Sequence, residues 1–143
     1  MKPIRPDLLT GWRVLVVEDD PYSMDVATIM LESHGAEVHT AEDGAEGLKV
    51  AQAVRPNFIL SDISMPGMDG WMMIDALKAD PRTKDIPVIA LTAHAMKGYR
   101  ERAIASGFHN FLTKPLTPET FIHDLISLLV DVPEMTERLK DSV

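Results

Sequence analysis

The chain has 143 residues, a formal net charge of −8 and no cysteine. This length suits one domain with a full hydrophobic core, and contents of 45% apolar and 25% charged residues are typical of folded globular proteins rather than of disordered chains. The negative charge argues against a nucleic-acid-binding protein, and the lack of cysteine excludes disulfides, thiol catalysis and cysteine-ligated metals.

Five short apolar segments alternate with five segments of helical character. The first, WRVLVV at residues 12–17, is too continuously apolar for a half-exposed strand and indicates a strand buried on both faces. In the segment that follows, Pro21 suits the first turn of a helix and Gly35 its end. We expect strands at residues 12–17, 36–40, 57–61, 86–92 and 109–113, and helices at residues 21–35, 43–54, 71–80, 96–107 and 117–130.

This alternation of strand and helix predicts an α/β fold with a doubly wound parallel sheet and helices on both of its faces. We place the domain at residues 12–130, with a leader at 1–11 and a tail at 131–143 that either continues as a helix or frays. The leader has no apolar stretch of the kind found in signal peptides, and no segment approaches the roughly 20 apolar residues of a membrane span. A soluble, cytoplasmic protein is therefore expected.

Polar side chains follow four of the five expected strands. They are Glu18, Asp19 and Asp20 after the first strand, Asp62 after the third, Thr92 at the end of the fourth and Lys114 after the fifth. Because the carboxyl ends of parallel strands share one edge of the sheet, these carboxylates are expected to crowd together. Crowded carboxylates need a counter-charge, which Mg²⁺ supplies, while a lysine and a hydroxyl suit phosphate oxygens. The set therefore predicts a site at which a phosphoryl group is transferred to an aspartate.

Each of these residues also has an ordinary explanation. Asp20 directly precedes Pro21 and is most simply the N-cap of the first helix, which is the role we favour. Glu18 and Asp19 can be solvated loop acids, and a single threonine or lysine at a strand end is unremarkable. Their joint occurrence at four strand ends favours a common site.

Four segments resemble the signature segments of response-regulator receiver domains, the CheY-like proteins of two-component signalling. They are VLVVEDDP, LSDISMPGMDG, IALTAHAM and FLTKPL, which occur in the family's order and span about residues 12–130. The resemblance implies a flavodoxin-like (βα)5 fold with strand order 2-1-3-4-5. It also implies a phosphorylation-dependent switch rather than an enzyme.

The resemblance assigns a phosphoacceptor and a metal site. Asp62 matches the aspartate that receives the phosphoryl group. Glu18 and Asp19 match the acidic pair that organises Mg²⁺, with Asp19 and Asp62 as direct ligands. The backbone carbonyl of Ser64 matches the third protein ligand, and its side chain lies at a position that tunes the chemistry.

Further matches concern the switch. Thr92 matches the hydroxyl that moves toward the phosphoryl group, and Lys114 matches the family's lysine, whose bond to Pro115 is cis in such domains. Phe111 matches the aromatic switch, with phenylalanine where tyrosine also occurs. His94, two residues past Thr92, is a candidate for tuning loss of the phosphoryl group, although an exposed histidine without a role is the simpler interpretation.

The implied partners are a sensor histidine kinase or histidine phosphotransfer protein and a downstream protein target, with no nucleic acid and no membrane. The last helix carries a wide apolar stripe, formed by Phe121, Ile122, Leu125, Ile126, Leu128 and Leu129. We expect the tail to cover this stripe; the alternative is a partner or dimer surface formed with the fourth helix and the fifth strand. The sequence leaves open whether the chain acts alone or belongs to a longer hybrid kinase.

Three other functions fit the sequence less well. A Mg²⁺-dependent phosphatase with an aspartate nucleophile usually carries a second aspartate two residues later, where this chain has Ser64. A flavodoxin-like FMN-binding module needs a phosphate-binding loop after the first strand, where this chain has the acidic segment EDDP. A degenerate receiver used only for docking would not need the full set of acids, threonine and lysine.

Overall fold

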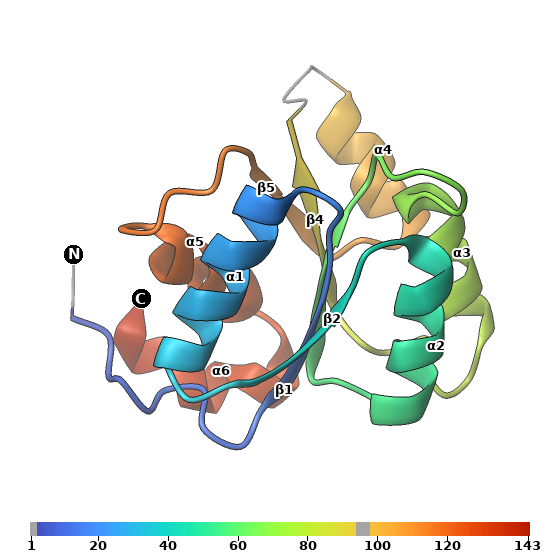
Figure 1. The fold of residues 1–143 in the computed structure, drawn as a ribbon. Coiled ribbons are helices and arrows are strands. Elements are labelled where there is room, and N and C mark those ends of the chain that lie inside the picture. The colour runs from blue at the N-terminus through green and yellow to red at the C-terminus, as the bar shows by residue number, and fades with distance from the viewer. Residues whose placement is uncertain (1–2, 94–97) are drawn as a thin grey trace.

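The computed structural model describes residues 3–93 and 98–143 and is built around a five-stranded sheet (Figure 1). All four pairs of neighbouring strands are parallel, and the strand order is β2-β1-β3-β4-β5. The strands are β1 (Arg13–Val17), β2 (Glu37–Ala41), β3 (Phe58–Asp62), β4 (Val88–Thr92) and β5 (Asn110–Thr113). The predicted doubly wound fold and its strand order are therefore confirmed.

Helices cover both faces of the sheet. They are α1 (Pro21–Ser33), α2 (Gly44–Val54), α3 (Gly70–Ala79), α4 (Tyr99–Ser106), α5 (Phe121–Leu129) and α6 (Pro133–Leu139), followed by the short 3-10 helix η1 (Lys140–Ser142). Figure 1 shows α1 and α5 on one face and α2 and α3 on the other. None of the helices in the described part of the chain is long and apolar enough to cross a membrane.

The continuous apolar run of β1 is explained by these two layers. Val14 and Val16 pack with α1 and α5, whereas Leu15 and Val17 pack with α2 and α3, and all four are fully buried. Because successive side chains of a strand point to opposite faces, a strand covered on both sides needs an apolar residue at every position.

The first three helices each begin with an aspartate cap. The carboxylate of Asp20 accepts hydrogen bonds from the backbone N–H of Ser23 at 3.1 Å and from its hydroxyl at 2.7 Å. Asp43 and Asp69 cap α2 and α3 in the same way. The predicted capping role of Asp20 is confirmed.

The fourth helix is shorter than expected among the described residues, because Gly98 and Gly107 lie outside it as its two caps. Gly98 was expected inside the helix, but it is the N-cap of α4 and has a φ of 87°, a conformation that glycine adopts without a steric penalty. On α4 only Ala103 is fully buried. Trp71 of α3 contacts this helix through the ring of Tyr99, with centroids 5.8 Å apart, and through Arg102, whose guanidinium lies 4.0 Å from the indole centroid.

The segments that flank the expected domain pack into the same core. The expected tail forms α6 and η1, and Met135 and Leu139 are buried in the cluster that α1 and α5 form with the sheet. Leu8 and Leu9 of the leader are buried in that cluster as well. The apolar stripe of α5 is thus largely covered from within the chain, as expected, because Phe121 and most of its other members are buried.

Arg138 connects the two terminal segments. Its guanidinium donates to the backbone carbonyls of Leu8 at 3.1 Å and Thr10 at 3.0 Å, and it lies 5.2 Å from the centroid of the Trp12 ring. A single side chain therefore ties α6 to the leader and to the entry of β1.

We expect Arg138→Ala to lower the free energy of unfolding by about 1–2 kcal/mol, because the variant loses two hydrogen bonds that the charged guanidinium donates and one cation–π contact. Urea unfolding followed by circular dichroism measures this change. Lys140→Ala is the matched control, since Lys140 is exposed and its ion pair is with the exposed side chain of Glu137. Equal stability of the two variants would show that Arg138 does not fasten the terminal segments.

Candidate functional site

The predicted site residues lie at the carboxyl edge of the sheet. Asp62 is the last residue of β3 and Thr92 the last of β4. The parallel register of β1 and β3 brings Glu18 beside Asp62. The backbone N–H of Lys114 donates to the carbonyl of Thr92 at 2.7 Å, which fixes Lys114 at the same edge.

Lys114 lies between two buried carboxylates. Its ammonium nitrogen is 2.6 Å from Oε1 of Glu18 and 3.1 Å from Oδ2 of Asp62. The side chain of Glu18 is 0% exposed, that of Asp62 9% and that of Lys114 15%. A single ammonium thus faces two carboxylates in a largely water-excluded space, and the negative charge is not fully compensated.

Burial changes the protonation of this group. Loss of hydration raises the pKa of Glu18 to about 7, and the nearby carboxylate of Asp62 acts in the same direction. Lys114 and the backbone N–H of Asp20 oppose this rise. Burial lowers the pKa of Lys114, but the two carboxylates more than offset it, so its pKa lies above the ordinary value and the side chain stays charged.

The cluster has the donors that a hard divalent cation prefers. Carboxylate oxygens of Glu18, Asp19 and Asp62 all lie within 4.8 Å of one another. Asp19 is exposed, so the cluster is open to solvent on one side. Asp20, although adjacent, is bound to Ser23 instead. Oxygen-only donors, excess negative charge and access to water fit Mg²⁺, which retains part of its hydration shell.

The remaining predicted residues surround this cluster. Thr92 is buried, with 2% exposure, and Phe111 is half-buried against the layer that contains α2, α3 and α4. Ser64 is exposed, and its backbone N–H donates to Oδ1 of Asp62 at 3.2 Å. The peptide bond between Lys114 and Pro115 is cis, as the resemblance implied. His94 lies outside the described residues.

Sequence reasoning missed Gly70, the first residue of α3. Its N–H donates to the carbonyl of Ile63 at 2.9 Å. A Cβ atom at this position would lie 2.6 Å from the carbonyl oxygen of Asp62 and 2.7 Å from the Cα of Ile63. The motif MDGW contained the glycine, but only the folded chain shows that α3 begins in contact with the backbone of the acidic site.

We expect Gly70→Ala to destabilise the protein by about 1–3 kcal/mol, because the added methyl group meets backbone atoms that move only together with the end of β3. Alanine would otherwise favour a helix by about 0.5–1 kcal/mol over glycine, so a loss of stability isolates the steric contact. Urea unfolding measures the change. A variant at least as stable as the wild type would show that the site tolerates the displacement.

This geometry agrees with the family to which the sequence is similar. The response regulator receiver domain matches residues 14–126, which include every residue of the acidic site. The chain belongs to the response regulator receiver family. Receiver domains are phosphorylation-dependent switches of two-component signalling systems, so the predicted family and class of function are confirmed.

Individual relatives agree with this assignment. The protein PilH of Pseudomonas aeruginosa is 36% identical over 117 residues, which are 82% of this chain and 97% of PilH. The chemotaxis response regulator CheY4 of Vibrio cholerae superposes with a TM-score of 0.78 at 33% identity, covering 84% of this receiver and all of CheY4. The receiver domain of the sensor histidine kinase PA1611 of Pseudomonas aeruginosa has a TM-score of 0.74 at 32% identity, covering 84% of this chain and 98% of that one, and its structure has a magnesium ion in the active-site cleft.

Proposed function

We propose that this receiver accepts a phosphoryl group from a phosphohistidine donor onto Asp62, with Mg²⁺ bound at the acidic cluster. The observation that carries the proposal is the position of Asp62. Its carboxylate lies at the end of β3, 3.1 Å from Lys114 and in one cluster with Glu18 and Asp19. A nucleophile, a fixed cation and a metal-binding acidic pair thus converge on one point, as phosphoryl transfer requires.

In the proposed step, a carboxylate oxygen of Asp62 attacks phosphorus. The new O–P bond forms as the P–N bond of the phosphohistidine breaks, and the imidazole of the donor leaves with the electron pair. Lys114 stabilises the charge of the phosphoryl oxygens, and the N–H of Ser64 holds the carboxylate in place. Asp19 and Asp62, with the Ser64 carbonyl, are the proposed Mg²⁺ ligands, and Glu18 orients them; bound Mg²⁺ supplies charge neutralisation.

The switch is proposed to proceed from Thr92. Its hydroxyl turns toward the phosphoryl oxygens, the segment after β4 follows, and Phe111 moves inward. The shallow attachment of α4, with only Ala103 fully buried, supports a helix that shifts at low cost. The result is a population shift between two packings of the α4–β5–α5 surface.

The proposed partners are a histidine kinase or histidine phosphotransfer protein as donor and a protein target that reads the shifted surface, which is also the proposed dimer surface. The function rests on contacts with proteins, so we propose a cytoplasmic site of action, no direct binding to nucleic acid or membrane, and no catalysis beyond the receiver's own phosphorylation and dephosphorylation.

The test is intact-mass spectrometry after incubation with a small acyl phosphate, in Mg²⁺ and in EDTA. We expect a mass increase equal to one phosphoryl group per chain in Mg²⁺ only. If no increase occurs, a stable phosphoryl mimic such as beryllofluoride provides a second readout: absence of Mg²⁺-dependent shifts in the amide spectrum would leave only a docking role for the domain.

A further inference from the structure

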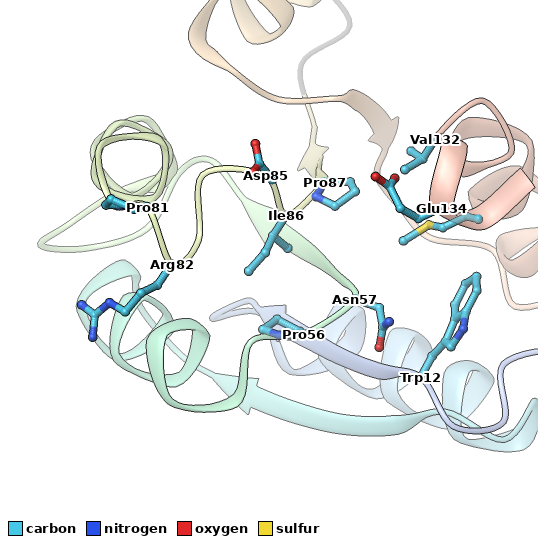
Figure 2. Close-up of a pocket in the computed structure, with 11 residues that line it drawn as sticks. Trp12, Pro56, Asn57, Pro81, Arg82, Asp85, Ile86, Pro87, Val132 and Glu134 are labelled. Carbon is cyan, nitrogen blue, oxygen red and sulfur yellow. The ribbon is translucent and has the colours of Figure 1, made fainter.

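A groove crosses the protein at the end of the sheet opposite the acidic site. Figure 2 shows its first hollow, of about 300 Å³, where the segments that precede β3 and β4 face α6. A second hollow, of about 520 Å³, adjoins it toward α4. Four residues line both hollows and form a saddle between them: Asp85, Pro87, Val132 and Glu134.

Part of the groove is built by residues outside the family match. Trp12 and three lining residues from the start of α6, among them Glu134 and Met135, lie outside residues 14–126, the part that matches the receiver family. The tight packing of α6 and the leader, with Arg138 fastened to the backbone of both Leu8 and Thr10, gives this wall a fixed position. The site is therefore preformed by the terminal segments.

Each hollow is lined by both apolar and polar residues, and the saddle between them is acidic. The first has Trp12, Ile86, Met135 and prolines beside Asn57 and Arg82, and the second has Ile104 and Phe108 beside Lys78 and the ion pair of His109 with Asp131. Proline has no N–H, so the walls offer little backbone for the addition of a strand, and recognition must rest on side chains.

The two carboxylates of the saddle form no direct ion pair within the described part of the chain. Neither Asp85 nor Glu134 has an ion pair within 4.0 Å among the described residues, and both are exposed. Arg82, at the edge of the first hollow, is paired with Asp80 at 2.8 Å. Lys78, in the second hollow, donates to two backbone carbonyls and attracts Asp85 only at longer range.

We propose that this groove binds an extended segment of a partner protein that carries a basic side chain between two apolar side chains. In an extended chain, side chains at positions i, i+2 and i+4 point to the same side. The outer two contact the apolar side chains of the two hollows, and the central lysine or arginine meets Asp85 and Glu134. Charge complementarity selects this occupant, because the saddle presents two exposed carboxylates that form no direct ion pair with the described residues, on a chain with a net charge of −8.

Trp12 reports on this binding, because it lines the groove. The backbone N–H of Ser64, at the opposite end of the sheet beside Asp62, is the internal control. We would titrate the ¹⁵N-labelled full chain with the peptide acetyl-Leu-Ser-Arg-Ser-Leu-amide and record its amide and indole N–H spectrum. We expect saturable shifts of Trp12, Ile86 and Val132, and none of the Ser64 amide.

Matched peptides and variants test the assignment. Replacing the central arginine of the peptide by glutamate is expected to abolish binding, and replacing both leucines by serine to weaken it strongly. The double variant Asp85→Asn, Glu134→Gln is expected to bind the arginine peptide about tenfold more weakly. The variant Asp25→Asn, Glu32→Gln, with the same change of charge on the exposed face of α1, is expected to bind like the wild type.

Four results would overturn the proposal. Two concern the peptides: no saturable shift at millimolar concentration, or equal binding of the arginine and glutamate peptides. The third is equal weakening of binding by the two double variants. The fourth is movement of the same resonances when the chain is concentrated without peptide, which would identify a second copy as the occupant. The comparison of peptides requires no change to the protein, so misfolding of a variant cannot obscure the outcome. None of these readouts depends on phosphorylation of Asp62.

Discussion

Asp62→Asn is expected to reduce phosphoryl incorporation from a small acyl phosphate to below detection. The amide is a far weaker nucleophile than the carboxylate, and every other part of the proposed site converges on this one side chain. The change keeps the size of the side chain, and Oδ1 can still accept the hydrogen bond from the backbone N–H of Ser64, whose nitrogen lies 3.2 Å from Oδ1 of Asp62. Intact-mass spectrometry in Mg²⁺ measures the result.

The adjacent residues Asp19 and Asp20, which follow β1, provide a matched pair of variants. Asp19→Asn removes a proposed metal ligand and is expected to raise the Mg²⁺ concentration needed for half-maximal incorporation by about tenfold or more. Asp20→Asn makes the same change one residue later, but asparagine still caps α1, so both stability and incorporation are expected to match the wild type. Undiminished incorporation by Asp62→Asn, or equal losses from Asp19→Asn and Asp20→Asn, would refute the proposed site.

The sequence predicts most of this fold because its signals are local. A strand covered on both faces must be apolar at every position, as in β1, and an aspartate three residues before a free N–H caps a helix, as Asp20 does. The meeting of Glu18 with Asp62 also follows from the sequence, since it depends only on the strands being parallel and adjacent.

The features that the sequence does not predict depend on contacts between distant residues. Arg138 and Leu8 are separated by 130 positions in the sequence, and nothing local in either segment encodes their hydrogen bond. The approach of Gly70 to the backbone of Asp62 depends on the angle at which α3 leaves the sheet. The groove of Figure 2 requires the walls from both termini and from the loops before β3 and β4.

The acidic site and the groove lie at opposite ends of the sheet. The proposed phosphoryl chemistry lies at the carboxyl ends of the strands, whereas the groove lies at their amino ends and is built in part by segments outside the family match. A partner held in the groove therefore leaves the acidic site accessible. This arrangement permits one protein to bind this receiver while another phosphorylates it.

Lys114→Met is expected to destabilise the metal-free protein by about 1–2 kcal/mol at pH 8, because Glu18 and Asp62 then lie close together in a buried site without a cation. Methionine keeps the length of the side chain and its apolar contacts, so the change removes mainly the charge. Lys49→Met, on the exposed surface of α2, is the matched control and is expected to alter stability by less than about 0.5 kcal/mol. Urea unfolding in EDTA measures both.

The pH dependence of this loss distinguishes electrostatic repulsion from poor packing. Burial raises the pKa of Glu18 to about 7 even with Lys114 present, and removal of Lys114 raises it further. A carboxyl whose pKa is raised in the folded state favours folding most at low pH, and that contribution is lost as pH rises through the folded-state pKa. The difference between Lys114→Met and the wild type should therefore be small at pH 5 and grow toward pH 8. Saturating Mg²⁺ should reduce this difference in stability at pH 8, because an ion bound at the folded cluster replaces the missing charge.

A difference in stability that is independent of both pH and Mg²⁺ would assign the loss to packing. Lys114 would then have no part in balancing the charge of Glu18 and Asp62.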